Sequence, residues 1–187
     1  MGTIEFHAWA SPTGAVEAPD RIIFDLDHDE GLDFSDVKQA ARGISKHLTD
    51  IGLVNFPLLS GGKGVHVAVP LTRGHGWEEH ADSSRRFAGA LCYADPERFV
   101  ATMSRAKRKG KIFIDWLSNQ RGATAVVPFS ARSRAGAPVA VAVTWEEFAG
   151  FEDAHPFAIG DAGTLLARAQ SPALQNWGVA KQSLPAL

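Results

Sequence analysis

The sequence predicts an α+β (mixed α/β) fold, in which a central mixed or antiparallel sheet carries flanking helices. Three observations support this class. Apolar, β-branched segments such as 20–27 and 65–71 are typical of strands in a buried sheet. Residues 35–51 repeat apolar side chains at helical spacing. Both kinds of segment are mixed along 187 residues, a length that suits one core, so we expect a single domain over 1–187.

The elements are expected in a definite order. Strands are predicted at 4–9, 20–27, 56–60 and 65–71, then at 111–117 and within 123–130 and 137–145; helices are predicted at 35–51, 77–91, 95–106, 145–150 and 162–170. Ser35 is the expected N-cap of the first helix and Gly52 its stop, while Pro96 should lie in a first helical turn.

The arrangement of these elements also follows. Helices 35–51 and 77–106 should pack on one face of the sheet, and the opposite face should stay open for a substrate. The segment 151–187 carries no recognisable chemistry and should close the domain, with a frayed tail at "LPAL".

Composition limits the location and the kind of partner. The apolar fraction is 45% and the charged fraction 21%, as in ordinary soluble proteins. No apolar run approaches the roughly 18 residues of a membrane span. The N-terminus lacks the pattern of a secretory signal. Cys92 is the only cysteine, which excludes an internal disulfide and a cysteine zinc cage. We expect a cytoplasmic protein without membrane contact.

Charge is distributed unevenly despite a net charge of −2. Acids crowd residues 25–36, including Glu30, and cations crowd "RAKRKGK" at 105–111. Either run alone is compatible with a solvated surface. A chain this balanced is not a general nucleic-acid coat, so any binding of DNA or RNA should use a local basic patch.

The stretch "PDRIIFDLDHDEG" places two acids at the end of an apolar strand. Residues two apart on a strand share a face, with Cα atoms roughly 6.5–7 Å apart, so Asp25 and Asp27 should project together. Such carboxylates repel each other unless a cation lies between them, and Mg²⁺ or Mn²⁺ is the usual ion of an all-oxygen site. Asp115, on the strand at 111–117, is a candidate third ligand. The alternative is a strand end with solvated acids.

The stretch "LLSGGKGVHVAVP" predicts a strand, a glycine-rich turn and a returning strand. Gly61 and Gly62 permit a turn whose N–H groups can face an anion. Lys63 offers a charge to phosphate, Ser60 a hydroxyl, and His66 lies within the returning strand. The P-loop spacing GxxxxGK[ST] is absent. The alternative is a hairpin whose glycines serve only the turn, with His66 on a solvated face.

Arginines follow the strand that carries Asp115. Arg121, Arg132 and Arg134 lie within a short distance of it along the chain, and arginine pairs well with phosphate oxygens. Each arginine alone is more often a surface residue. Three acids, a lysine-bearing glycine turn and several arginines together suit two divalent ions and a nucleoside triphosphate.

A family resemblance adds to this interpretation. The collinear segments "IEFHAW", "PDRIIFDLD", "SGGKGVHVAVPL" and "KGKIFIDWLSNQRGATAVVPFSARSRAGAPVAVAVTWEE", over roughly 4–148, resemble the polymerase domain of bacterial DNA ligase D, within the archaeo-eukaryotic primase superfamily. The resemblance assigns Asp25, Asp27 and Asp115 to metal-binding positions. It assigns Ser60, Lys63 and His66 to nucleotide phosphates, His7 to the nucleotide, and Arg108, Arg132 and Arg134 to the incoming nucleotide and the strand ends.

The resemblance also implies an activity and partners. The family adds nucleotides, often ribonucleotides, to DNA ends at double-strand breaks during non-homologous end joining, commonly with Mn²⁺. The implied partners are DNA ends, nucleoside triphosphates, and a separate ligase or N-terminal polymerase chain. The family's portion before the "IEFHAW"-like strand, which helps to grip the template, is absent here. Ser118 replaces a frequent arginine, and Ala8 a common proline.

Two other functions stay open at this point. A non-catalytic nucleotide- or DNA-end-binding remnant, or one piece of a split polymerase, would keep the fold without independent activity. A phosphatase of the haloacid dehalogenase type would use Asp25 as a nucleophile and Asp27 as a general acid. The phosphatase pattern lacks its expected Thr or Val, because position 29 is Asp, and it gives "SGGKGVH" no role.

Overall fold

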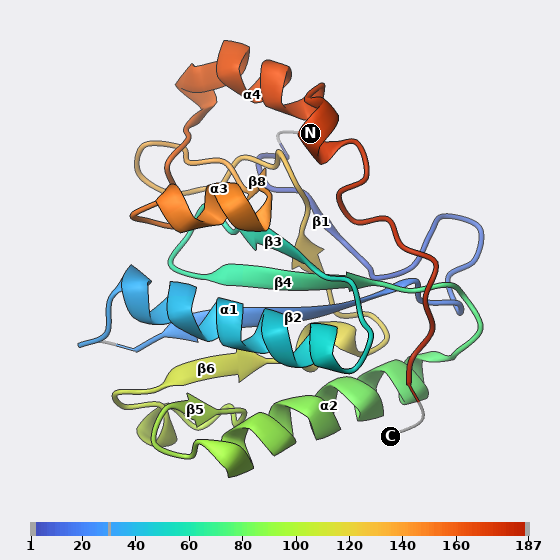
Figure 1. Cartoon of the computed structure of the whole chain (residues 1–187). Coiled ribbons are helices and arrows are strands. Elements are labelled where there is room, and N and C mark those ends of the chain that lie inside the picture. The colour runs from blue at the N-terminus through green and yellow to red at the C-terminus, as the bar shows by residue number, and fades with distance from the viewer. Residues whose placement is uncertain (1–2, 30, 186–187) are drawn as a thin grey trace.

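A computed structural model describes residues 3–29 and 31–185. Within these residues, six strands form a mixed sheet in the order β5-β6-β2-β4-β3-β8 (Figure 1). The strands are β2 Arg21–His28, β3 Phe56–Leu59, β4 Val65–Pro70, β5 Phe99–Val100, β6 Ile112–Asp115 and β8 Val141–Ala142. Only the β5–β6 pair is parallel among these neighbours. The predicted α+β class, with a mixed sheet, is confirmed.

Two long helices cover one face of this sheet. The helices are α1 Phe34–Asp50, α2 Trp77–Ala94, α3 Trp145–Gly150 and α4 Ala162–Ala169, and the short 3₁₀ turns are η1 Arg105–Lys107, η2 Leu117–Asn119, η3 Ile159–Asp161 and η4 Pro172–Leu174. In Figure 1, α1 crosses β2 and β4 while α2 runs below β6. In the described part of the chain, no helix combines the length and apolarity that crossing a membrane requires.

The core lies between the sheet and these two helices. On β2, Ile22, Phe24 and Leu26 are buried in the same apolar cluster as Val37 and Ile44 of α1. Every second residue of β2 therefore faces the helices, which leaves Asp25 and Asp27 on the other face. The sequence predicted that both acids share this open face, away from the helices.

The N-cap of α1 differs from the prediction. Asp33, not Ser35, caps the helix: its Oδ1 accepts hydrogen bonds from the backbone N–H groups of Ser35 (2.8 Å) and Asp36 (3.3 Å). Asp36 returns a bond to the N–H of Asp33 at 3.0 Å, which completes a capping box. Asp33 is the N-cap because only a helix that begins at Phe34 places Asp36 at the third helical position, where its carboxylate can accept the N–H of Asp33. Gly52 ends the helix with a positive φ of 82°, as expected.

The predicted helix at 95–106 is wrong. α2 continues to Ala94, and the chain then turns, forms the edge strand β5 at Phe99–Val100, and reaches η1. Asp95 precedes Pro96, and a residue before proline disfavours the helical region, so α2 cannot run on. Phe99 is buried and pairs with Ile112 of β6. This pairing holds the segment extended, as an edge strand of the sheet.

The strand predicted at 4–9 is much shorter than expected. Only β1 His7–Ala8 pairs, with β7 Ala125–Val126, in a separate two-stranded sheet. Pro128 supplies no N–H to continue the ladder. Phe129 then turns the chain with a φ of 65°. The region 137–145 likewise contributes only the short strand β8 to the main sheet.

The described part of the C-terminal segment is bound to the main sheet and is not frayed. Gln182 accepts a hydrogen bond from the N–H of Val54 and donates to the carbonyls of Val54 and Pro70, all at 2.7–2.8 Å. Leu184 packs against the main core. The prediction of a frayed "LPAL" is therefore wrong for its first two residues, and its last two lie outside the described residues, as does Glu30.

Candidate active site

The three predicted acids come together through strand register. Asp25, on the central strand β2, lies directly opposite His66 of β4 on one side and Asp115 of β6 on the other. Opposed residues of antiparallel strands point to the same face, with Cβ atoms about 5 Å apart. Asp115, Asp25 and His66 thus form one row across three strands, and Asp27 stands on the same face two residues farther along β2.

Asp25 and His66 form a half-buried ion pair. His66 Nε2 lies 3.4 Å from Asp25 Oδ2, and the His66 side chain is 5% exposed. Burial lowers the pKa of His66, but the charge and hydrogen bond of Asp25 together with the charge of Asp27 outweigh it, so the pKa is raised. Burial likewise raises the pKa of Asp25, yet the neighbouring His66 holds it below its usual range. His66 is therefore not on a solvated face, and its pairing keeps Asp25 ionised.

The other two acids resist ionisation. Partial removal from water, together with the charges of Asp25 and Asp115, raises the pKa of Asp27 to about 6. Desolvation also raises the pKa of Asp115, although its Oδ1 accepts the N–H of Leu117 at 2.8 Å. Unbalanced negative charge of this kind attracts a cation. Across residues 3–29 and 31–185, no three acidic, histidine or cysteine side chains converge tightly enough, as they stand, to hold a metal ion.

The glycine-rich turn packs tightly on its surroundings. A Cβ on Gly61, whose φ is 67°, would lie 2.9 Å from Cγ of Arg132 and from the backbone carbonyl carbon of Val139. A Cβ on Gly64 would lie 2.3 Å from the carbonyl oxygen of Leu26 and 2.7 Å from Oδ1 of Asp27. Two of these glycines thus permit close approach as well as the turn, and Gly64 brings the turn onto the acid face.

The turn itself is held by its own hydroxyl group. Gly62 donates its N–H to Oγ of Ser60 at 3.2 Å, and Ser60 is buried. The carbonyl of Ser60 accepts a hydrogen bond of 2.5 Å from Nη1 of Arg132. The Arg134 guanidinium approaches within 3.4 Å of the position that a Cβ on Gly62 would take. The turn predicted from the sequence therefore lies beside Arg132 and Arg134, two of the predicted arginines.

A cleft of about 520 Å³ opens beside Asp27. Its lining residues are Asp27, His28, Asp29, Lys63, Arg105, Arg108, Lys111, Phe113 and Arg134. Lys63, Arg108 and Arg134, predicted separately from three parts of the sequence, meet here. The structure adds Arg105 and Lys111, two further cations of the basic run at 105–111, to the cleft. The basic run at 105–111 is thus a wall of the cleft as well as a solvated surface.

His7 and Arg132 lie beside the turn, outside this cleft, and a third residue joins them. Glu5 Oε2 is 2.9 Å from Nε2 of His7 and 3.3 Å from Nε of Arg132, and Oε1 accepts the N–H of Ser133 at 2.5 Å. Hydrogen bonds from His7 and Ser133 lower the pKa of Glu5 to about 2. Sequence reasoning missed Glu5, although its spacing of two residues from His7 places both on one side of an extended segment.

Arg121 does not join the site. Its guanidinium makes a bidentate pair with Glu17, with Nε 3.0 Å from both carboxylate oxygens, and lies 5.8 Å from the ring centre of Trp9. Arg121 is therefore a surface residue near β1 that pairs with Glu17, and surface exposure is the common state of a single arginine.

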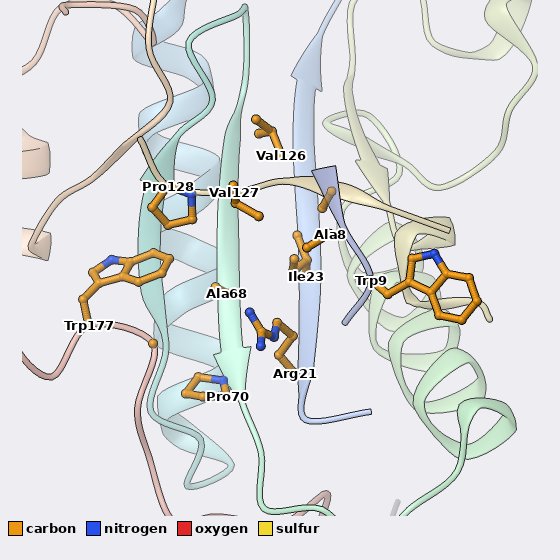
Figure 2. A pocket seen from close by; sticks show the side chains of 12 residues that line it. Ala8, Trp9, Arg21, Ile23, Ala68, Pro70, Val126, Val127, Pro128 and Trp177 are labelled. Carbon is orange, nitrogen blue, oxygen red and sulfur yellow. The ribbon is translucent and has the colours of Figure 1, made fainter. Parts of the chain in front are cut away.

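The acid-bearing face of the sheet is open only in part. Beyond Asp25, the face bears Ile23, Arg21 and Ala68, and Figure 2 shows these beneath β1, the segment after β7, and Trp177. Only a cavity of about 50 Å³ remains there. The predicted open face is thus correct for the half that carries the acids and wrong for the half nearer Pro70, which the N- and C-terminal segments cover.

Comparisons with known proteins identify the family of the chain. A model of the family described as LigD, primase-polymerase domain, matches residues 1–173. The multifunctional non-homologous end joining protein LigD of Pseudomonas aeruginosa is 42% identical over 155 residues, which make up 83% of this chain and 18% of that protein. Its counterpart in Mycolicibacterium smegmatis is 36% identical over 157 residues, 83% of this chain and 21% of that protein.

A solved structure shows the same fold. The polymerase domain of Mycobacterium tuberculosis ligase D, solved in complex with DNA, superposes with a TM-score of 0.80 at 30% identity, covering 94% of this chain and 63% of that one. The chain spans about a fifth of the length of the two curated relatives. The resemblance drawn from the sequence is confirmed, and the chain belongs to the LigD primase-polymerase domain family.

Proposed function

We propose that the chain is a metal-dependent nucleotidyltransferase that adds nucleotides to DNA 3′ ends during double-strand-break repair by non-homologous end joining. The observation that carries this proposal is the adjacency of two opposite charge groups. Asp25, Asp27 and Asp115 share one face of the sheet, and a basic cleft that includes Lys63 opens directly beside Asp27. Family membership supports the same activity.

The acids suit divalent ions in type and in electrostatics. All three offer carboxylate oxygens, which Mg²⁺ and Mn²⁺ prefer, and the raised pKa values of Asp27 and Asp115 show negative charge that is not yet balanced. Asp25 and Asp27 would hold two ions, with Asp115 completing the catalytic one. When bound, such ions activate an attacking hydroxyl and stabilise a leaving pyrophosphate.

The residues around the glycine turn would hold the triphosphate. Lys63 and Arg134 line the cleft beside Asp27, where their charges would stabilise the negative charge that develops on the leaving group. Ser60 directly follows β3, which leads into the turn, and His66 lies on β4, which leads out of it. His66 would act by holding Asp25 ionised, and the Ser60 hydroxyl by fixing the N–H groups of Gly62 and its neighbours.

The basic wall of the cleft suits a DNA end. Arg105 and Lys111 present cations at its edge, and phosphate contacts supply most of the sequence-independent affinity for DNA. The related domain from M. tuberculosis was solved with DNA. A cytoplasmic location and cooperation with a ligase, or with a further polymerase segment, fit this role.

Primer extension tests the proposal. The chain would be incubated with a primed DNA end, labelled ribonucleotides and Mn²⁺. We expect extension by the unchanged chain, and loss to near background in Asp25→Asn and Asp115→Asn. Asp82→Asn is the matched control, because Asp82 pairs with Arg85 on the exposed face of α2. Extension that persists in both site variants would show that these acids are not catalytic.

A non-catalytic nucleotide-binding module is the second candidate, because no three acidic, histidine or cysteine side chains of the described residues converge tightly enough to hold a metal ion. Titration with adenosine triphosphate and Mg²⁺ separates the two. Binding without extension by the unchanged chain, at high protein concentration, would favour the binding module. The phosphatase interpretation has lost its support, since the family match covers residues 1–173, the whole region that carries the acids.

A further inference from the structure

Phe113 occupies an unusual position for a large apolar side chain. It lies on β6 opposite Asp27, on the face that carries Asp115 rather than on the helix face, where Ile112 and Ile114 belong to the core. It lines the basic cleft, yet the residue is only 3% exposed. Something must therefore cover its ring on the side that would otherwise face water.

The covering group is the guanidinium of Arg108. Its Cζ lies 3.4 Å from the ring centre of Phe113, while its Nε donates to the carbonyl of Thr102 at 3.2 Å. A stacked guanidinium donates from the edge of its plane, since the ring contacts only its flat side. One edge group, Nη2, lies 3.4 Å from Sδ of Met103.

Arg108 is unlike most other cations of its run. Arg105, Lys107 and Lys109 are exposed, whereas Arg108 is half-buried. An exposed arginine must give up side-chain freedom when it binds a ligand, which weakens the binding. An arginine already held flat against a buried ring avoids most of that loss.

We propose that Phe113 is a positioning residue, which holds the Arg108 guanidinium in the orientation that receives a phosphate group of the nucleotide in the cleft. The inference rests on the proposed function, because it takes the ligand of the cleft to be a nucleoside triphosphate. Phe113 acts through Arg108 and need not touch the nucleotide itself.

A double-mutant cycle on nucleotide binding tests this inference. Adenosine triphosphate with Mg²⁺ would be titrated calorimetrically into the unchanged chain, Phe113→Leu, Arg108→Ala and the double variant. We expect Phe113→Leu to weaken binding by about three- to tenfold, the range of a cation–π contact at a partly buried site. In the Arg108→Ala background, the same change should have less than about a twofold effect, because its partner is gone.

Two further variants separate positioning from a general packing role. Phe113→Tyr keeps an aromatic face and should retain the affinity of the unchanged chain. Phe99→Leu is the matched control: it removes a buried ring from beneath Arg98, whose Cζ is 5.3 Å from that ring, outside the cleft. It should leave nucleotide affinity unchanged. In extension assays, Phe113→Leu should raise KM for the nucleotide more than it lowers kcat.

The outcomes are distinct. An equal effect of Phe113→Leu with and without Arg108, or no effect at all, would overturn the inference while leaving the proposed function intact. Absence of nucleotide binding by the unchanged chain would overturn both. If thermal melting shows that Phe113→Leu is unfolded, Phe113→Met, whose flexible side chain adapts to the space left by the ring, takes its place in the cycle with the same expected coupling.

Discussion

Replacing Gly64 with alanine should destabilise the protein through one backbone contact. The added Cβ would lie 2.3 Å from the carbonyl oxygen of Leu26, where ordinary contact begins at 3.4 Å. Because that atom belongs to the backbone of β2, relief requires a shift of about 1 Å between β2 and the turn. Overpacking of this kind costs about 1–3 kcal/mol of folding free energy. The φ of Gly64 is not in the left-handed region, so the cost is steric.

Urea denaturation measures this effect, and Gly89→Ala is the matched control. Gly89 lies inside α2 with nothing within 4 Å of an added Cβ, so the same substitution there should stabilise the chain by about 0.5–1 kcal/mol. Gly64→Ala should lower the midpoint without changing the slope. It should also weaken nucleotide binding, because the new Cβ lies 2.7 Å from Oδ1 of Asp27. If Gly64→Ala is as stable as the unchanged chain, the close approach has no energetic consequence and the reasoning fails.

Three other changes test separate features of the structure. The pKa of Glu5 is lowered to about 2, so its ionised carboxylate should stabilise the fold by about 1 kcal/mol after screening by water. This stabilisation should be present above pH 4.5 and lost as the pH falls toward 2. Urea denaturation should therefore show that Glu5→Gln has a lower free energy of unfolding than the unchanged chain at pH 6, with the difference vanishing near pH 2. Asp33→Ala should cost about 1 kcal/mol of unfolding free energy and Ser35→Ala much less, and equal losses would contradict the assigned N-cap. Lys63→Ala should reduce affinity for adenosine triphosphate, measured by calorimetry, while Lys46→Ala, on the exposed side of α1, leaves it unchanged; an equal affinity in both would remove Lys63 from the site.

The sequence predicted the faces of the central strands because that information is local. Alternation of Phe24, Asp25, Leu26 and Asp27 fixes which side chains share a side, whatever the neighbouring strands are. The pairing of Asp25 with Asp115 and His66 is different, because it depends on β2 lying between β4 and β6. No periodicity encodes that order. The collinear family motifs supplied it indirectly, by assigning both acids to one site.

The errors arose where local signals conflict. Pro96 is compatible both with a first helical turn and with a chain that has just left a helix, and only the partner strand β6 decides for the second. Asp33 and Ser35 are both good N-cap residues, and the choice depends on which one pairs with an acid three residues on. Glu5 was missed because a single acid carries no pattern until Arg132 and Ser133 are folded against it.

Asp27 and the cations of the cleft form no ion pairs with each other in the described part of the chain, an arrangement that does little to stabilise the folded chain. Asp27 shares a cleft with Lys63, Arg108 and Arg134, yet among the ion pairs of the described residues none joins an acid of the site to one of these cations. Gly64 seats the turn that carries Lys63 close to Asp27, while the Phe113 ring holds the Arg108 guanidinium flat. Opposite charges that stay separated across a hydrated cleft favour a ligand carrying both signs. A divalent cation bound to a triphosphate, the ligand of the proposed function, is of this kind: its metal would meet the acids and its phosphates the cations.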